Sequence, residues 1–174
     1  MPFRMHPSIL LQPGTFTVLL APEERLVQIL HRHAPHFQRY LTLYVCGNYS
    51  RILNGIDRRC PEFSVQRAFT GFQLQKILAE AHQTIIWVEH DPTLYEENGV
   101  PVRLISLALK DAARTSAVVL CSPACDPVLC EMARFADRIF YLETADGRLP
   151  YRAQATGLSR EKPPSQSQTR LEIF

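Results

Sequence analysis

The feature that most constrains the fold is the recurrence of short apolar runs of strand length, separated by segments with helical periodicity. The apolar runs predict strands over Thr15–Leu20, Leu41–Cys46, Phe63–Ala68, Thr84–Val88 and Ala117–Cys121. The intervening segments predict helices over Glu23–His33, Phe72–His82, Val102–Arg114 and Pro127–Phe135, and a short helix within 47–60. Strands that alternate with helices are typical of a parallel sheet covered on both faces. We therefore expect an α/β three-layer sandwich with a mostly parallel central sheet.

The C-terminal part of the chain has a different pattern. Three short strands are expected, over Arg138–Glu143, Leu149–Ala153 and Arg170–Ile173. The turn "ADGR" favours a hairpin between the first two, so we expect an antiparallel edge. The length of 174 residues suits one domain, 1–174. Within it we expect an N-terminal extension over 1–13 and a flexible polar loop over 159–168.

The composition excludes several classes of protein. The chain is 46% hydrophobic and 21% charged, with a formal charge of +2, so neither nucleic-acid binding nor disorder is predicted from the totals. No apolar run reaches the length of a membrane span. The five cysteines form no regular framework, which favours a cytoplasmic protein. Cys121, Cys125 and Cys130 have an uncommon spacing for zinc, so we interpret them as small buried thiols and expect no metal.

Several stretches, taken in order, resemble the ATPase core of the RecA/RadA recombinase superfamily, including its KaiC-like branch. "PGTFTVLL" followed by a helix is similar to the first strand and phosphate loop of that family. "VQRAFTGFQLQKIL" is similar to its Arg-Ala-Phe/Tyr-Thr strand-to-helix segment, and "TIIWVE" to its Walker B strand. "LTLYVCGNYSRI" and "FADRIFYLETADGRLPYRA" occupy the positions of further family segments. The resemblance covers almost the whole chain and implies a RecA-like fold.

The segment at the phosphate-loop position lacks the chemistry of that loop. It reads Ala21, Pro22, Glu23, Glu24, Arg25, with no glycine, lysine or hydroxyl residue. A phosphate loop needs converging backbone N–H groups, a lysine for the β- and γ-phosphates and a hydroxyl for Mg²⁺. Two glutamates at a helix N-terminus instead place negative charge where phosphate would bind. We therefore expect neither ATP nor Mg²⁺ as a cofactor, and we expect Glu23 and Glu24 to cap the helix.

The other catalytic positions of the family are also depleted. The turn after the second strand, where the family has a carboxylate, reads Cys-Gly-Asn over 46–48. Glu89, with Asp91 close by, remains as a Walker B-like remnant, and we interpret Glu89 as a solvated carboxylate at a strand end. His90 is interpreted as a surface loop residue.

The remaining histidines and the charged loops are further candidate binding sites. His31, His33 and His36 form either a metal cluster or a solvated helix end that Pro35 terminates, and we favour the helix end. The loops that hold DNA in recombinases are acidic here, with Glu89, Asp91, Glu96 and Glu97 in one and Asp126 in the other. Acidic loops repel phosphate. Basic residues lie elsewhere and are candidate DNA or partner contacts or a solubilising surface: Arg51, Arg58, Arg59, Arg67, Arg148, Arg152, Arg160 and Lys162.

These observations favour a RecA-like domain that has lost ATP hydrolysis and serves as an interaction or accessory module. By analogy with the family, the expected partner is a RecA-like paralogue or a second copy, in DNA repair or recombination or in regulation of a related ATPase. Two alternatives stay open. One is a direct DNA-binding protein that uses the arginine-rich surfaces. The other is an enzyme with a relocated site at the carboxyl ends of the strands, using Glu89, Asp91, His90 or Cys121.

Overall fold

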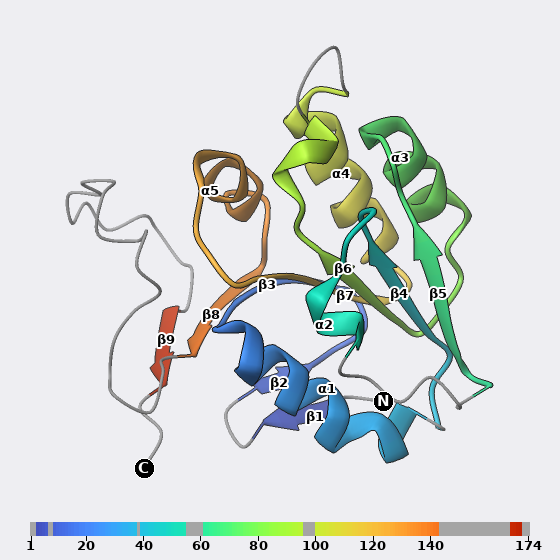
Figure 1. Ribbon diagram of the computed structural model, residues 1–174, viewed down its shortest axis with the longest axis vertical. Coiled ribbons are helices and arrows are strands. Elements are labelled where there is room, and N and C mark those ends of the chain that lie inside the picture. The colour runs from blue at the N-terminus through green and yellow to red at the C-terminus, as the bar shows by residue number, and fades with distance from the viewer. Residues whose placement is uncertain are drawn as a thin grey trace.

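The computed structural model describes residues 3–6, 9–37, 39–54, 61–95, 100–142 and 168–171 (Figure 1). The strands are β1 (Phe3–His6), β2 (Ile9–Leu11), β3 (Thr15–Leu20), β4 (Thr42–Cys46), β5 (Phe63–Arg67), β6 (Ile85–Glu89), β7 (Ala117–Ser122), β8 (Arg138–Leu142) and β9 (Gln168–Leu171). The helices are α1 (Glu23–Phe37), α2 (Arg51–Asn54), α3 (Gly71–Glu80), α4 (Val102–Ala112) and α5 (Pro127–Ala133), with a 3₁₀ turn, η1 (Pro92–Tyr95).

Seven strands form one parallel sheet in the order β5-β4-β6-β7-β3-β8-β9. The predicted α/β class and the predicted parallel sheet are therefore confirmed. Because all these strands run the same way, the loops that follow β3, β4, β6 and β7 lie at one edge, the carboxyl edge. Ligands of open α/β sheets bind at this edge.

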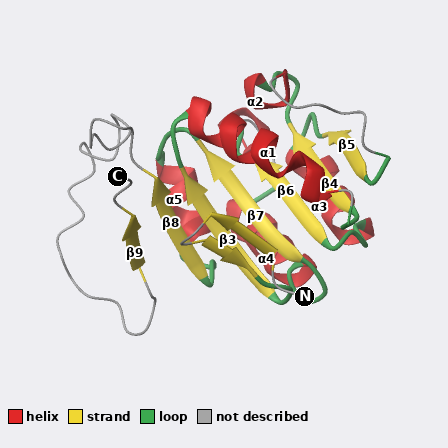
Figure 2. Ribbon diagram, turned by 90° about the horizontal axis from the view of Figure 1, so that it is seen from below, coloured by secondary structure: helices red, strands yellow, loops and turns green. Residues whose placement is uncertain are grey.

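Two apolar layers separate the sheet from its helices, which makes the three-layer sandwich. Figure 1 shows α1 and the β1–β2 pair below the sheet, and α3, α4 and α5 above it; Figure 2 shows the same sheet from below. The lower layer includes Leu26 and Leu30 of α1 packed with Trp87 of β6. The upper layer includes Leu74 of α3 and Ile105 of α4. Alternate residues of each central strand point into opposite layers, so these strands are apolar throughout.

The first residues of the chain form a small sheet that the sequence analysis did not predict. β1 and β2 pair in antiparallel fashion within the expected N-terminal extension. Met5, Ile9 and Leu11 are at most 1% exposed and belong to the lower apolar layer. These three residues of the extension are therefore part of the core.

Two further expectations about chain course were wrong. Helix α1 does not end at Pro35 but continues to Phe37. Pro35 therefore lies within the last turn of α1, where its missing N–H removes one backbone hydrogen bond without ending the helix. The last strand, β9, pairs parallel with β8 and not antiparallel.

Some expectations fall on residues outside the described ranges. These are the strand Leu149–Ala153, the "ADGR" hairpin and residues 159–167 of the polar loop, whose last residue, Gln168, begins β9. Within the described ranges, no helix combines the length and apolar character needed to cross a bilayer.

Candidate functional site at the carboxyl edge

The turn between β3 and α1 has little backbone to offer a phosphate group. Ala21 is fully buried, and its N–H donates to the carbonyl of Ser122 at 3.1 Å, which extends the β3–β7 pairing by one residue. Pro22 has no N–H. The N–H of Arg25 donates to the carbonyl of Pro22 at 2.9 Å. Three of the five turn positions therefore have no N–H left for a ligand, and the residues present do not fit an ATP phosphate chain.

Two charged side chains of this turn, Glu23 and Arg25, have protein partners. Glu23 and Glu24 lie in the first turn of α1, and the Glu23 carboxylate is 3.9 Å from the Arg51 guanidinium. Arg25 donates to Gln28 Oε1 at 3.2 Å on the surface of the helix. Both acids therefore lie at the positive end of the helix dipole, where carboxylates are stabilising. That they cap the helix by direct hydrogen bonds stays a prediction.

Glu89, at the end of β6, is held by two hydroxyl groups. The Tyr44 hydroxyl donates to Glu89 Oε2 at 2.8 Å, and the Ser50 hydroxyl donates to the same oxygen. Ser50 Oγ in turn accepts the N–H of Leu53 at 2.9 Å, at the start of α2. Burial raises the pKa of the Glu89 carboxyl above its usual value, although both hydroxyl groups oppose the rise. Glu89 is therefore a half-buried carboxylate that lines the pocket and is also held by hydrogen bonds, which its interpretation as a solvated carboxylate did not include.

His90 is buried, so its interpretation as a surface residue was wrong. Its backbone N–H donates to the Cys121 carbonyl at 2.8 Å, which continues the β6–β7 pairing and turns the ring inward. Its ring stacks on Tyr95, with centroids 5.8 Å apart, and its Nε2 lies 2.7 Å from Asp126 Oδ2. Asp126 Oδ1 accepts the N–H of Leu129 at 2.8 Å and so caps α5. One carboxylate therefore joins the ends of β6 and α5.

Asp91 supplies an acid at the turn after β4, where the sequence has none. Its Oδ1 accepts the N–H of Thr93 at 3.0 Å and the hydroxyl of Thr93 at 2.6 Å. Its Oδ2 lies over Gly47, so close that a Cβ at this position would be 2.0 Å from it. Because Gly47 has no Cβ, the carboxylate of Asp91, which follows the neighbouring strand β6, can lie against the backbone.

These side chains line an open pocket of about 580 Å³ at the carboxyl edge. The lining residues are Glu23, Asn48, Tyr49, Arg51, Glu89, His90, Asp91, Pro92 and Thr93. The pocket thus brings together five candidate residues from α1, α2 and the end of β6: Glu23, Arg51, Glu89, His90 and Asp91. Three carboxyl groups oppose one arginine, so the pocket suits a cation or a hydrogen-bond donor and repels phosphate.

Sequence reasoning missed Tyr44 and Ser50. Tyr44 is fully buried in β4, and it pairs in register with Trp87, two residues before Glu89. A tyrosine within a buried apolar strand needs a partner for its hydroxyl, which is the signal that could have pointed to a carboxylate nearby.

The other predicted site residues, the cysteines and the basic residues, lie in different environments. Cys121 is fully buried and burial raises its pKa, so it is not an accessible nucleophile. Among the described residues, no three His, Cys, Asp or Glu side chains are arranged so that they could hold a metal ion. Arg51 is exposed, and Arg67 donates to the carbonyl of Asn48. The other named charged residues lie outside the described ranges: Arg58, Arg59, Glu96, Glu97, Arg148, Arg152, Arg160 and Lys162.

The fold and site define an α/β three-layer protein with an acidic pocket at the carboxyl edge of a parallel sheet. No protein-family model matches the chain. An uncharacterized protein of the archaeon Archaeoglobus fulgidus is 33% identical over 135 residues, which are 77% of this chain and 68% of the archaeal one. The chain belongs to the same family as this archaeal protein.

A Glu89→Gln substitution is expected to flatten the dependence of stability on pH. Because burial raises the folded-state pKa of Glu89, the native state binds more protons than the unfolded chain above the unfolded pKa of about 4.3. The free energy of unfolding therefore falls as pH rises from there through the folded pKa, and glutamine removes this contribution. Urea unfolding between about pH 4 and pH 7.5 measures it. Glu80→Gln, at an exposed position, is the control; equal slopes in all three proteins would contradict the prediction.

Proposed function

We propose that this chain is a RecA-like domain that neither binds ATP in the usual mode nor hydrolyses it, and that acts as a protein-interaction module. The observation that carries the proposal is the turn Ala21–Arg25. Its backbone donors at Ala21 and Arg25 are already bonded to carbonyl groups, and Pro22 has none. If only the side chains of a phosphate loop were replaced, its backbone N–H groups would still converge on a phosphate. Here the N–H groups of Ala21 and Arg25 bond to carbonyl groups of the protein instead.

The electrostatics of the pocket support the same proposal. Glu23, Glu89 and Asp91 line it together with a single arginine, Arg51. A carboxylate within 4–6 Å of a phosphate group is repelled by on the order of a few kcal/mol at a protein surface. A triphosphate in this place would meet several such groups without a lysine or a metal-binding hydroxyl to compensate.

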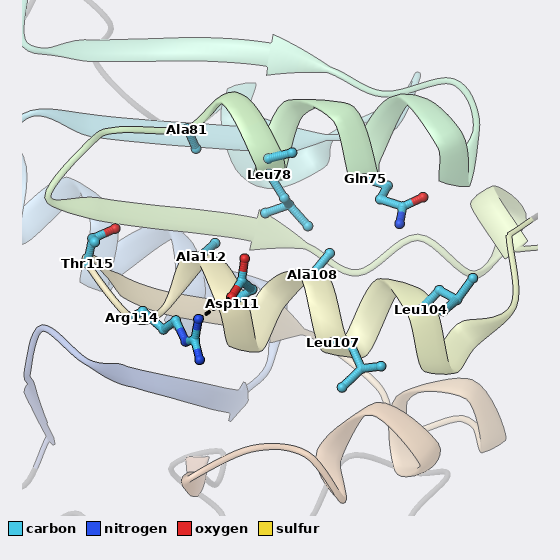
Figure 3. Close-up of a pocket in the computed structure, with 11 residues that line it drawn as sticks. Gln75, Leu78, Ala81, Leu104, Leu107, Ala108, Asp111, Ala112, Arg114 and Thr115 are labelled. Carbon is cyan, nitrogen blue, oxygen red and sulfur yellow. Dashed lines mark ion pairs between the residues drawn. The ribbon is translucent and has the colours of Figure 1, made fainter.

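A second surface supports binding to protein. A groove of about 530 Å³ runs between α3 and α4, and Figure 3 shows Leu78 of α3 pointing across it toward Ala108 and Ala112 of α4. Leu104 and Leu107 of α4, which also line it, are 45% and 44% exposed. Exposed leucines beside a groove are typical of a surface that another protein covers.

The partner proposed for this groove is a RecA-like relative, either an active ATPase or a second copy of this chain. The resemblance to recombinases places such a pair in DNA repair or recombination, or in the regulation of a KaiC-like ATPase, in the cytoplasm. This part of the proposal depends on analogy at the level of the fold.

The test has two arms. In the first, Mg-ATP is titrated calorimetrically into the purified protein, with an active RecA-like ATPase as the positive control. No saturable heat is expected at millimolar nucleotide. Tight, Mg²⁺-dependent binding would overturn the proposal.

In the second arm, the chain is cross-linked in extracts of its own organism and the captured proteins are identified by mass spectrometry. A RecA-like ATPase or a second copy is expected with the parent chain and is expected to be lost with Leu104→Glu/Leu107→Glu. Leu41→Glu is the matched control, because Leu41 is 50% exposed and lies outside the groove. Equal capture by all three chains would contradict the assignment of the groove.

The acidic pocket favours one alternative, an enzyme with a relocated site. Glu89, His90 and Asp91 converge there, at the edge where α/β sheets bind their ligands. This alternative is preferred if a small molecule raises the Tm of the parent protein and fails to raise that of an Asp91→Asn variant.

A further inference from the structure

The N-terminus of α5 carries two cysteines in contact. Asp126 is the N-cap residue, so Cys125 immediately precedes the cap and Cys130 is the fourth residue of the helix. Side chains at these two positions pack together in many helices and fix the direction in which the chain enters the helix. Here the contact is made by two thiols, with the sulfur atoms 2.9 Å apart.

We propose that Cys125 and Cys130 form a reversible intramolecular disulfide by exchange with a low-molecular-weight disulfide such as oxidised glutathione. In the first step, the thiolate of one cysteine attacks the small disulfide, forms a mixed disulfide and releases one small thiolate. In the second, the other cysteine loses its proton, attacks the protein sulfur of the mixed disulfide and releases the second small thiolate. The two protein thiols lose two electrons and two protons, which the small disulfide gains as it becomes two thiols.

The geometry separates this pair from the other described cysteines. Cys125 and Cys130 are each partly exposed, whereas Cys46 and Cys121 are buried. A small disulfide can therefore reach the pair. The sulfur atoms must approach by less than 1 Å to reach the bond length of about 2.04 Å. A lone thiol at either position would stop at the mixed disulfide.

The chemistry also predicts how the rate depends on pH. Burial, with the contact to Cys130, raises the pKa of the Cys125 thiol to about 12. The thiolate is the reactive form, so exchange that involves this sulfur accelerates as the pH rises above neutrality.

The bond would act on the candidate site through Asp126. This residue lies inside the ring that the disulfide closes, and its carboxylate contacts both the Leu129 N–H and His90. Closing the ring restricts the backbone on both sides of the cap. The oxidised protein therefore holds the cap of α5, and with it the partner of His90, more firmly than the reduced protein.

The experiment equilibrates the folded protein in glutathione redox buffers, quenches it with acid and alkylates the free thiols. Mass spectrometry is expected to show loss of two hydrogens and one peptide pair joined through Cys125 and Cys130, with reversal by excess reduced glutathione. Cys125→Ser and Cys130→Ser should each stop at a glutathione adduct. Hydrogen exchange at the Leu129 amide is expected to slow on the order of tenfold in the oxidised parent and to stay unchanged in both variants.

Two results would overturn the proposal. One is full alkylation of both cysteines after equilibration with oxidised glutathione. The other is pairing of either cysteine mainly with Cys60 or with a second chain. Both outcomes are independent of ATP and of the α3–α4 groove, so they leave the proposed interaction function to its own test.

Discussion

Replacing Trp87 with alanine is expected to lower the free energy of unfolding by about 3–5 kcal/mol. Trp87 is fully buried in β6, and it packs with α1 and the N-terminal strands in the lower apolar layer. The substitution removes the largest fully buried side chain and leaves a cavity that neighbouring strands on both sides prevent from collapsing. Urea unfolding measures the loss. Circular dichroism is the signal, because the variant lacks the tryptophan whose fluorescence would otherwise report unfolding.

Two control variants show whether the loss comes from the cavity. Trp87→Phe keeps an aromatic ring and removes the indole N–H, which has no hydrogen-bond partner among the described residues, so its loss should be clearly smaller. Phe72→Ala truncates a side chain that is 62% exposed and should change stability by at most about 0.5 kcal/mol. A loss for Trp87→Ala no larger than that of Phe72→Ala would contradict the assignment of Trp87 to the core.

Replacing Asp126 with alanine is expected to destabilise the protein by about 1.5–5 kcal/mol. Loss of a helix N-cap costs about 0.5–2 kcal/mol. The same change leaves the buried His90 ring without its carboxylate, and an unsatisfied buried polar group costs about 1–3 kcal/mol. Urea unfolding gives the total, and hydrogen exchange at the Leu129 amide reports the cap on its own.

Asp126→Asn is the matched variant for this prediction. The amide oxygen can still accept the Leu129 N–H, so the cap is retained, and the loss should stay below about 1 kcal/mol. If the free energy of unfolding of Asp126→Ala stayed within about 0.5 kcal/mol of that of the parent, the predicted stabilising role of the link between β6 and α5 would be contradicted.

Local hydrophobic patterns in the sequence predicted most strands and helices, because the same patterns determine which segments become strands and helices. Thr15–Leu20 was placed without error, and the other central strands differ from their predicted bounds by at most one residue at each end. Errors arose where long-range contacts decide the structure. Ile9 and Leu11 form too short a run to signal a strand, and only the lower apolar layer explains them. The direction of β9 depends on how the chain returns to the sheet, which local periodicity does not encode.

The candidate site was predictable in part for the same reason. Glu89 and Asp91 follow a recognisable buried strand, so their position at the carboxyl edge could be inferred. The burial of His90 could not, because it depends on Tyr95 and on Asp126, which is 36 residues away in the chain. Likewise, the hydroxyl groups that hold Glu89 come from 45 and 39 residues away, from a strand and a helix start that the sheet brings beside it.

The bond from the Ala21 N–H to the Ser122 carbonyl limits what point substitutions can change at this turn. Point substitutions that introduced a lysine and a serine after β3 would leave this bond in place, and the Pro22 and Arg25 amides would still offer nothing to a ligand. A phosphate site would require inserted residues that bulge away from β7 before α1 begins. Single substitutions at this turn would therefore change its side chains but not the protein partners of the Ala21 and Arg25 N–H groups.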